Sequence, residues 1–159
     1  MAKKKDQNIL LVPVDFSSFS EEALFFASGL AKCLSARLLV LHVIHDPEEA
    51  PGFYARQRKK KKYLQTMGEV AEEMMQEFLK KMRQAYPNET PIKKATPLLV
   101  VGRPVKRIVE VAERKQASMI IIGSQGRTGL SNLLLGSKAG QVVQLSTIPV
   151  TVVKTSKKK

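Results

Sequence analysis

Short apolar runs alternate with segments of helical periodicity along most of the chain. The runs are NILLVPVD (8–15), RLLVLHVI (37–44), a segment around 92–100, ASMIIIG (117–123) and PVTVV from Pro149. Apolar runs of this length, bounded by turn residues, predict strands. The second run is continuously apolar, as expected of a parallel strand covered on both faces. Pro97 lies in the third run, and proline cannot donate to a ladder, so this strand is expected at a sheet edge.

Four helices are expected between these runs. Over residues 20–35, Ser20 is the expected N-cap, and the apolar positions recur at spacings of three and four, at Ala23, Phe26, Ala27, Leu30 and Leu34. A long helix through Ala85 is expected from Leu64, Met67, Ala71, Met74, Phe78 and Met82. A third helix begins at Pro104, which suits a first turn, and a short fourth helix begins near Gly136. Cys33 is expected to be a small core residue on the first helix.

This alternation of strands and helices predicts a doubly wound α/β fold, with a mostly parallel sheet and helices on both faces. In such sheets, ligands bind beyond the carboxyl ends of the strands, where the strand order reverses. We expect the first and fourth strands to be neighbours there. Asp15 ends the first strand, and a glycine-rich loop follows the fourth, so the two features are expected to meet in one crevice.

The loop GSQGRTGLSNLLLGS (123–137) holds four of the nine glycines of the chain. It is not a Walker A motif, because Ser137 comes before Lys138, and it contains neither G-x-G-x-x-G nor G-x-S-x-G. The pattern that remains is G-x-x-G, nine residues, then Gly-Ser. It is compatible either with a flexible turn or with a phosphate cradle.

In a phosphate cradle, Gly123 and Gly126 would let backbone amides approach a ligand closely. Gly136 and Ser137 would stand at a helix start, where free amides and the helix dipole favour an anion. Arg127 and Lys138 would supply positive charge.

The chain of 159 residues is expected to form one domain, 1–159, with basic tails at about 1–7 and 155–159. Its formal net charge of +13 comes from the tails and one internal cluster around Lys59–Lys62, which together hold 12 of the 27 basic residues. The remainder is nearly neutral, so nucleic acid is not the expected partner. We interpret the cluster as a solvated segment, with polyanion binding as the alternative. No apolar run is long enough to span a membrane, and the start has no apolar signal core, so a cytoplasmic location is expected.

The motif Gly123-x-x-Gly126-x9-Gly136-Ser137 resembles the nucleotide motif of the universal stress protein family, in its ATP-binding branch. The resemblance covers nearly the whole chain, through ILLVPVDFS, LLVLHV, GRP and IIIGSQGRTGLSNLLLGS followed by PVTVV. It implies a five-stranded parallel sheet of order 3-2-1-4-5, of the adenine nucleotide alpha hydrolase-like type. It also implies a homodimer through the C-terminal strand, an adenine nucleotide (ATP, AMP or ADP), Mg²⁺ beside the phosphates, and a regulatory protein partner that it does not name.

The resemblance also implies roles for single residues. Asp15 would hydrogen-bond the ribose or adenine, Val43 would meet adenine through its backbone, and Pro13 would help to wall the base pocket. Gly123 and Gly126 would approach the ribose and phosphates. Gly136 and Ser137 would hold the β and γ phosphates.

Other roles for these residues stay open. Asp15 could bond only turn amides at the start of the first helix, and Val43 could be only a core residue. We interpret His42 as a satisfied core histidine, whereas His45 could border the pocket. No clear water-orienting residue is identifiable, and Gln125 is the one candidate. A nucleotide-binding regulatory protein is therefore favoured over a slow ATPase, and no catalytic residue is assigned.

Overall fold

The computed structural model of the protein describes residues 8–45, 57–127 and 135–155. Five parallel strands form one sheet in the order β3-β2-β1-β4-β5. They are β1 (Ile9–Pro13), β2 (Arg37–His45), β3 (Thr96–Gly102), β4 (Met119–Gly123) and β5 (Val150–Val153). The predicted strand order is confirmed, and so is the edge position of the proline-containing third strand.

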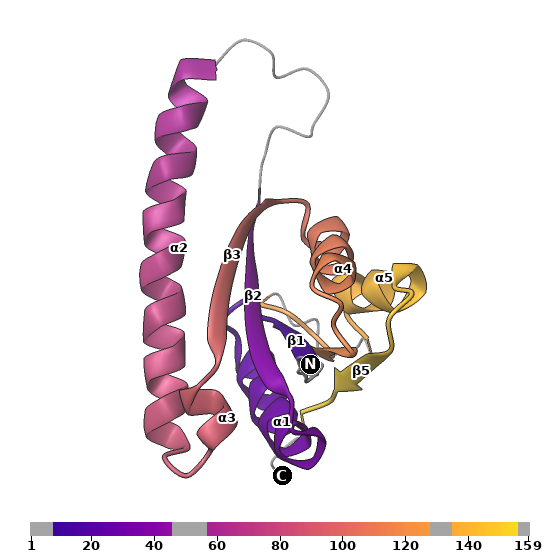
Figure 1. Ribbon diagram of the computed structural model, residues 1–159. Helices are drawn as coiled ribbons and strands as arrows, with labels where there is room; N and C mark the ends of the chain where they lie inside the picture. Colours follow the sequence, from indigo (N-terminus) through magenta and orange to yellow (C-terminus); the bar gives the residue numbers. More distant parts are fainter. Residues whose placement is uncertain (1–7, 46–56, 128–134, 156–159) are drawn as a thin grey trace, which may run out of the picture.

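Helices cover both faces of the sheet (Figure 1). One face packs against α1 (Ser18–Leu34), α2 (Gln57–Ala85) and α3 (Thr90–Lys93), and the other against α4 (Pro104–Arg114) and α5 (Ser137–Leu145). Both cores are made mainly of aliphatic side chains, and the central strands contribute fully buried residues to each. The covered faces explain why the central strands are continuously apolar rather than alternating.

Helix α1 differs from its prediction in three respects. Ser17, not Ser20, is the N-cap, and its side chain accepts a hydrogen bond from the Ser20 amide at 3.4 Å. Phe26 and Leu34 are 47% and 41% exposed, so they are not core residues. The helix instead packs small residues and Leu24 against the sheet, which brings it close to the strands. Cys33 is also exposed, because it lies outside the set of α1 residues that face the sheet.

The segment after α2 also differs from its prediction. The third strand was expected from about residue 92, but Thr90–Lys93 form the short helix α3 and the strand begins at Thr96. Pro91 stands in the first turn of α3, where a missing amide donor costs nothing. Residues 94–95 therefore connect the helix to the strand.

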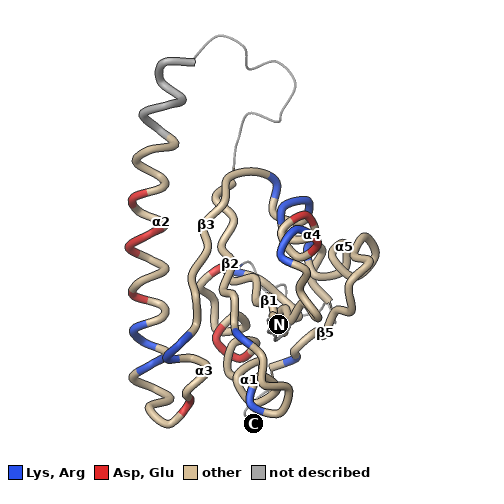
Figure 2. Tube along the Cα trace, viewed as in Figure 1, with Lys and Arg blue, Asp and Glu red and all other residues tan. Residues whose placement is uncertain are grey.

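Helix α2 is much longer than the strands and extends past the sheet in Figure 1. Its middle is acidic and its last turns are basic, as Figure 2 shows. Lys81 pairs with Glu21 of α1, which ties the two helices together. The side chains of Lys59–Lys62 and the lysines of both basic tails lie outside the described residues, so the polyanion alternative stays a prediction. No helix in the described ranges is long and apolar enough to cross a membrane.

Candidate functional site

Asp15 lies just beyond β1, and its two carboxylate oxygens have different partners. Oδ1 accepts hydrogen bonds from the Ser17 amide at 3.1 Å, from the Ser17 hydroxyl and from the Ser20 hydroxyl at 2.8 Å. Oδ2 accepts from the backbone amide of Arg127, in the glycine-rich loop, at 2.9 Å. Asp15 therefore does hold the start of α1, but it also joins the loop that follows β1 to the loop that follows β4.

These hydrogen bonds keep Asp15 ionised. Burial alone would raise the pKa of its carboxyl group. The Ser17 and Ser20 hydroxyls and the Ser17 and Arg127 amides outweigh burial, so the pKa lies below its ordinary value. At neutral pH the site thus contains a fixed negative charge. Oδ2 has one partner among the described residues, against three for Oδ1, and so it can accept a hydroxyl or amino donor from a ligand.

Gly126 and Gly123 are glycines for different reasons. A Cβ on Gly126 would lie 2.8 Å from Asp15 Oδ2, so a side chain there would push the loop away from the carboxylate. A Cβ on Gly123 would lie 2.8 Å from the Phe19 carbonyl oxygen and 2.9 Å from Phe19 Cβ. Gly123 therefore allows α1 to pack closely on β4, a role that the motif alone did not reveal.

Ser124 and Gly136 close the base of the loop. The Gly136 amide donates to the Ser124 carbonyl at 2.6 Å, and a Cβ on Gly136 would lie 3.2 Å from that oxygen. Ser124 is buried, and its own amide donates to the carbonyl of Val153, at the end of β5, at 2.8 Å. The two ends of the loop are thus fixed to each other and to the edge strand.

The start of α5 offers backbone donors. Gly136 is its N-cap, and the first amide that reaches back to the cap is that of Gly140, which donates to the Gly136 carbonyl. The amides of residues 137–139 therefore have no partner within the helix. Ser137 and Lys138 are exposed at this end. Free amides, a hydroxyl and a lysine at a helix N-terminus form a suitable environment for an anion.

Pro13 and Val43 lie at the carboxyl ends of β1 and β2. Pro13 is the buried last residue of β1 and pairs with Leu41, whose carbonyl accepts from the Val14 amide at 2.7 Å. Alternate residues of a strand direct their backbone groups to the same side. The N–H and C=O groups of Val43 therefore point to the same side of β2 as β1. They lie past Pro13, the last residue of β1 that pairs with β2. Its side chain packs in the core formed with α4 and α5.

The two histidines are in different environments. Nδ1 of His42 lies 2.8 Å from the Val14 carbonyl, and the ring packs against Phe16 with 4.3 Å between centroids. His42 is thus satisfied, as predicted. His45 ends β2 beside Gly102 and is exposed. Ser17, Ser20 and Ser124 were not predicted as site residues, although the serines of DFSSFS after a strand are a signal for side-chain caps around an aspartate.

Within the described residues, no three histidine, cysteine, aspartate or glutamate side chains gather in a way that could hold a metal. The site supplies one carboxylate, from Asp15. Mg²⁺ is commonly held by one or two carboxylates together with substrate phosphates and water. The residues present therefore suit a magnesium ion that arrives with a polyphosphate better than one held by protein ligands alone.

Comparisons with known proteins agree with this architecture. The universal stress protein family model matches residues 8–154. Universal stress protein MJ0531 of Methanocaldococcus jannaschii is 36% identical over 149 residues, which are 94% of this chain and 83% of that protein. Universal stress protein YxiE of Bacillus subtilis is 33% identical over 150 residues, which are 92% of this chain and 99% of that protein.

Solved structures share the fold. The structure of hypothetical protein MJ0577, also from Methanocaldococcus jannaschii, superposes with a TM-score of 0.67 at 30% identity, over 95% of this chain and 98% of that one. A universal stress protein in complex with cAMP gives a TM-score of 0.64 at 22% identity, over 94% and 98% of the two chains. One from Archaeoglobus fulgidus in complex with dAMP gives 0.61 at 22% identity, over 93% and 98%.

The fold and site define a doubly wound α/β protein whose loops meet at the carboxyl ends of β1 and β4. The chain belongs to the universal stress protein family.

Proposed function

We propose that this protein binds ATP at the carboxyl ends of β1 and β4 and acts as a nucleotide-dependent regulatory protein. The observation that carries the proposal is the hydrogen bond from the Arg127 amide to Asp15 Oδ2. It brings the first-strand carboxylate and the glycine-rich loop together beside the free amides of α5. The cAMP and dAMP complexes of the structural neighbours support an adenine nucleotide as the ligand.

The charges of the site give the nucleotide a direction. An ionised Asp15 repels phosphate, so its Oδ2 suits a ribose hydroxyl or the adenine amino group. The phosphates belong at the start of α5, with Gly136, Ser137 and Lys138, and beside Arg127. The backbone of Val43 and the ring of Pro13 would then border the adenine, and Gly123 and Gly126 would line the path between the two ends.

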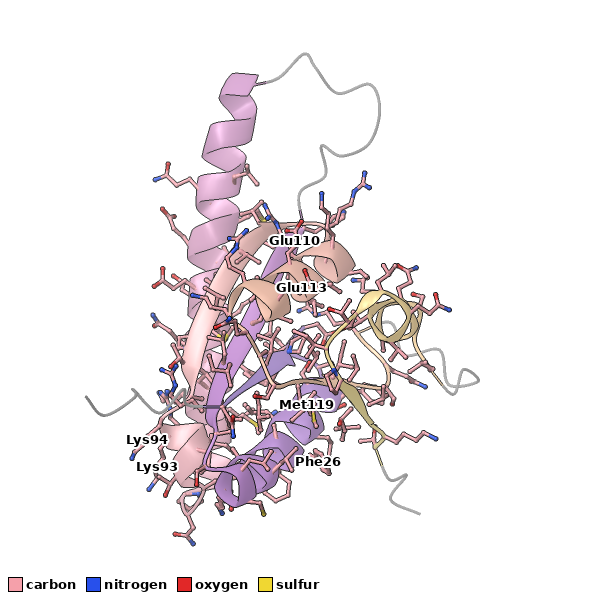
Figure 3. All side chains as sticks on the ribbon, turned by 45° about the vertical axis from the view of Figure 1, so that its right-hand side comes forward. Phe26, Lys93, Lys94, Glu110, Glu113 and Met119 are labelled. Carbon is pink, nitrogen blue, oxygen red and sulfur yellow. The ribbon has the colours of Figure 1, made fainter. Side chains whose placement is uncertain are left out.

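The regulatory part of the proposal rests on Ser124. Its amide donates to the Val153 carbonyl of β5, and its carbonyl accepts from the Gly136 amide. A movement of the loop on nucleotide binding would therefore also move the edge strand. We propose that β5 pairs with β5 of a second copy, because an unpaired apolar edge is a liability. Val143 and Leu145 on α5 and Phe26 on α1 are exposed, and both helices pack against β5. Figure 3 labels Phe26 on α1.

Slow ATP hydrolysis on the same site is the second candidate. Lys138 and Arg127 could offset developing charge, but hydrolysis also needs a group that orients water in line. Gln125 follows Ser124, is partly buried and stays a candidate for this role. Binding without efficient turnover is the function we propose.

Thermal unfolding of ligand-free protein with ATP, ADP, AMP and GTP, each with and without magnesium, tests the function. A ligand at 100 times its dissociation constant should add about 2.7 kcal/mol to the free energy of unfolding. Gly126→Val should lose the ATP shift, because its side chain would meet Asp15 Oδ2. Gly68→Ala is the control, since a Cβ there meets nothing within 4 Å. Absence of any shift would refute the proposal.

A further inference from the structure

Two side chains hold the peptide unit between Val14 and Asp15. His42 Nδ1 lies 2.8 Å from the Val14 carbonyl oxygen, and Ser20 Oγ accepts from the Asp15 amide at 2.9 Å. The C=O and N–H of a trans peptide point in opposite directions, so the unit is clamped from two sides. The same Ser20 hydroxyl donates to Asp15 Oδ1 at 2.8 Å. The clamp therefore fixes both the backbone and the carboxylate of Asp15.

The clamp also fixes the protonation pattern of the His42 ring. A carbonyl oxygen only accepts hydrogen bonds, so Nδ1 must carry a proton. In the neutral ring Nε2 is then unprotonated, and a second proton adds there. The bond from Nδ1 to Val14 exists in both forms, so titration of the ring charges it without releasing the clamp.

The turn held by this clamp has an unfavourable conformation. Phe16, the residue after Asp15, has φ of 66°, in the left-handed region that side chains other than glycine rarely adopt. Its ring packs against His42 and meets Phe78 of α2 edge-on, with 5.7 Å between centroids. His42 thus contacts this turn twice, through the Val14 carbonyl and through the Phe16 ring. Such strain persists only where the surroundings over-determine it, and it often marks binding sites.

The charged groups that act on the His42 ring are those of the candidate site. They are Asp15 after β1, Arg127 in the glycine-rich loop and Lys138 on α5. Phe78 of α2 is uncharged and packs on Phe16, the aromatic neighbour of the His42 ring. Burial lowers the pKa of His42, and Arg127 and Lys138 lower it further, against the hydrogen bond to Val14 and the Asp15 charge. Without a ligand the ring is therefore neutral at neutral pH.

We propose that His42 is the positioning residue that aims Asp15 at the nucleotide and that nucleotide binding adds a proton to its ring. This inference rests on the proposed function. A bound polyphosphate beside Arg127 and Lys138 offsets their positive charges, which favours the imidazolium form. The complex then binds more protons than the free protein. By linkage, affinity rises as the pH falls through the range in which His42 titrates.

The test measures the dissociation constant of ATP by titration calorimetry at pH 8 and pH 5.5, for the wild type, His42→Asn and His42→Leu. Asparagine places an amide nitrogen where Nδ1 stands but does not titrate, and leucine removes the donor. At pH 8 we expect His42→Asn to bind like the wild type and His42→Leu to bind roughly tenfold more weakly, the effect of one lost hydrogen bond. At pH 5.5 the wild type should gain roughly threefold or more over His42→Asn. Protonation of ATP itself is common to all three proteins and cancels in these ratios.

Equal affinities of His42→Leu and the wild type at pH 8, or equal pH dependence of His42→Asn and the wild type, would overturn the inference while leaving nucleotide binding intact. A wild type that binds no nucleotide refutes the proposed function instead. Hydrogen exchange at the Asp15 amide then tests, without nucleotide, whether His42 holds the peptide between Val14 and Asp15. Exchange should be faster in His42→Leu than in the wild type and unchanged in His42→Asn, and equal rates in all three would refute the clamp.

Discussion

Replacing Asp15 by asparagine tests the central contact of the site without nucleotide. The carboxylate accepts from three donors on Oδ1 and from the Arg127 amide on Oδ2. Asparagine has one oxygen, so in either orientation its NH₂ group faces a donor. The favoured orientation keeps the oxygen toward Ser17 and Ser20, because more bonds are made there. The NH₂ group then faces the Arg127 amide, and the loop loses its bond to β1.

The loss of stability in Asp15→Asn follows from these contacts. Hydrogen bonds to charged groups contribute about 1.5–3 kcal/mol each, and Asp15→Asn loses the charge for all of them and one bond outright. Because the site is partly exposed, we expect the lower part of this range, about 1.5–2 kcal/mol, in the free energy of unfolding at pH 7. Urea unfolding followed by circular dichroism measures it. Glu22→Gln removes the same charge from an exposed position of α1 and should change stability by less than about 0.5 kcal/mol.

The pH dependence gives a second readout of the same substitution. The pKa of Asp15 is lower in the folded protein than in the unfolded chain, so the stability it contributes is present above the unfolded value, about 3.9. That contribution is lost as the pH falls through the folded pKa. The difference in stability between the wild type and Asp15→Asn should therefore shrink on acidification from pH 5. Equal stabilities of Asp15→Asn and Glu22→Gln at pH 7 would refute the reasoning.

Four other substitutions give expected outcomes in unfolding or assembly. Gly123→Ala should lower the free energy of unfolding by about 1–3 kcal/mol, because its Cβ meets the Phe19 backbone. Gly68→Ala should raise it by about 0.5–1 kcal/mol. Equal effects of the two substitutions in urea unfolding would contradict this. Ser28→Ala should cost about 1–3 kcal/mol by thermal unfolding, since a fully buried hydroxyl donates to Glu89 at 2.6 Å, and a neutral result would argue against that bond. Val152→Lys on β5 should shift light scattering from dimer to monomer, and a wild type that is already monomeric would remove the proposed interface.

Much of the fold was predictable because the central strands are buried on both faces. Continuous apolar runs such as RLLVLHVI are readily assigned to buried parallel strands, and Pro97 predicted an edge position for its strand. The sidedness of α1 was not predictable in detail. Phe26 matches the helical period, yet it is exposed, because Leu24 and a set of alanines and serines face the sheet instead. The spacing of apolar residues alone does not tell which of two adjacent faces of the helix is buried.

The candidate site was predictable as a meeting of two loops, but not in its internal contacts. Asp15 was named from its place at the end of the first strand and Gly126 from the glycine motif, and their contact follows from the strand order. The packing role of Gly123 depends on how closely α1 approaches β4, which no local pattern encodes. The clamp by His42 depends on the register of β2 against β1, since it is the register that brings the ring to the Val14 carbonyl.

The most direct test of the central claim is a map of backbone amide chemical shifts during titration of ligand-free protein with ATP. The account predicts saturable shifts concentrated at Val43, Arg127 and the amides of residues 137–139, with Asp15 and Ser124 following. Shifts confined to other parts of the chain, or none at saturating ATP, would contradict a nucleotide site at the carboxyl ends of β1 and β4.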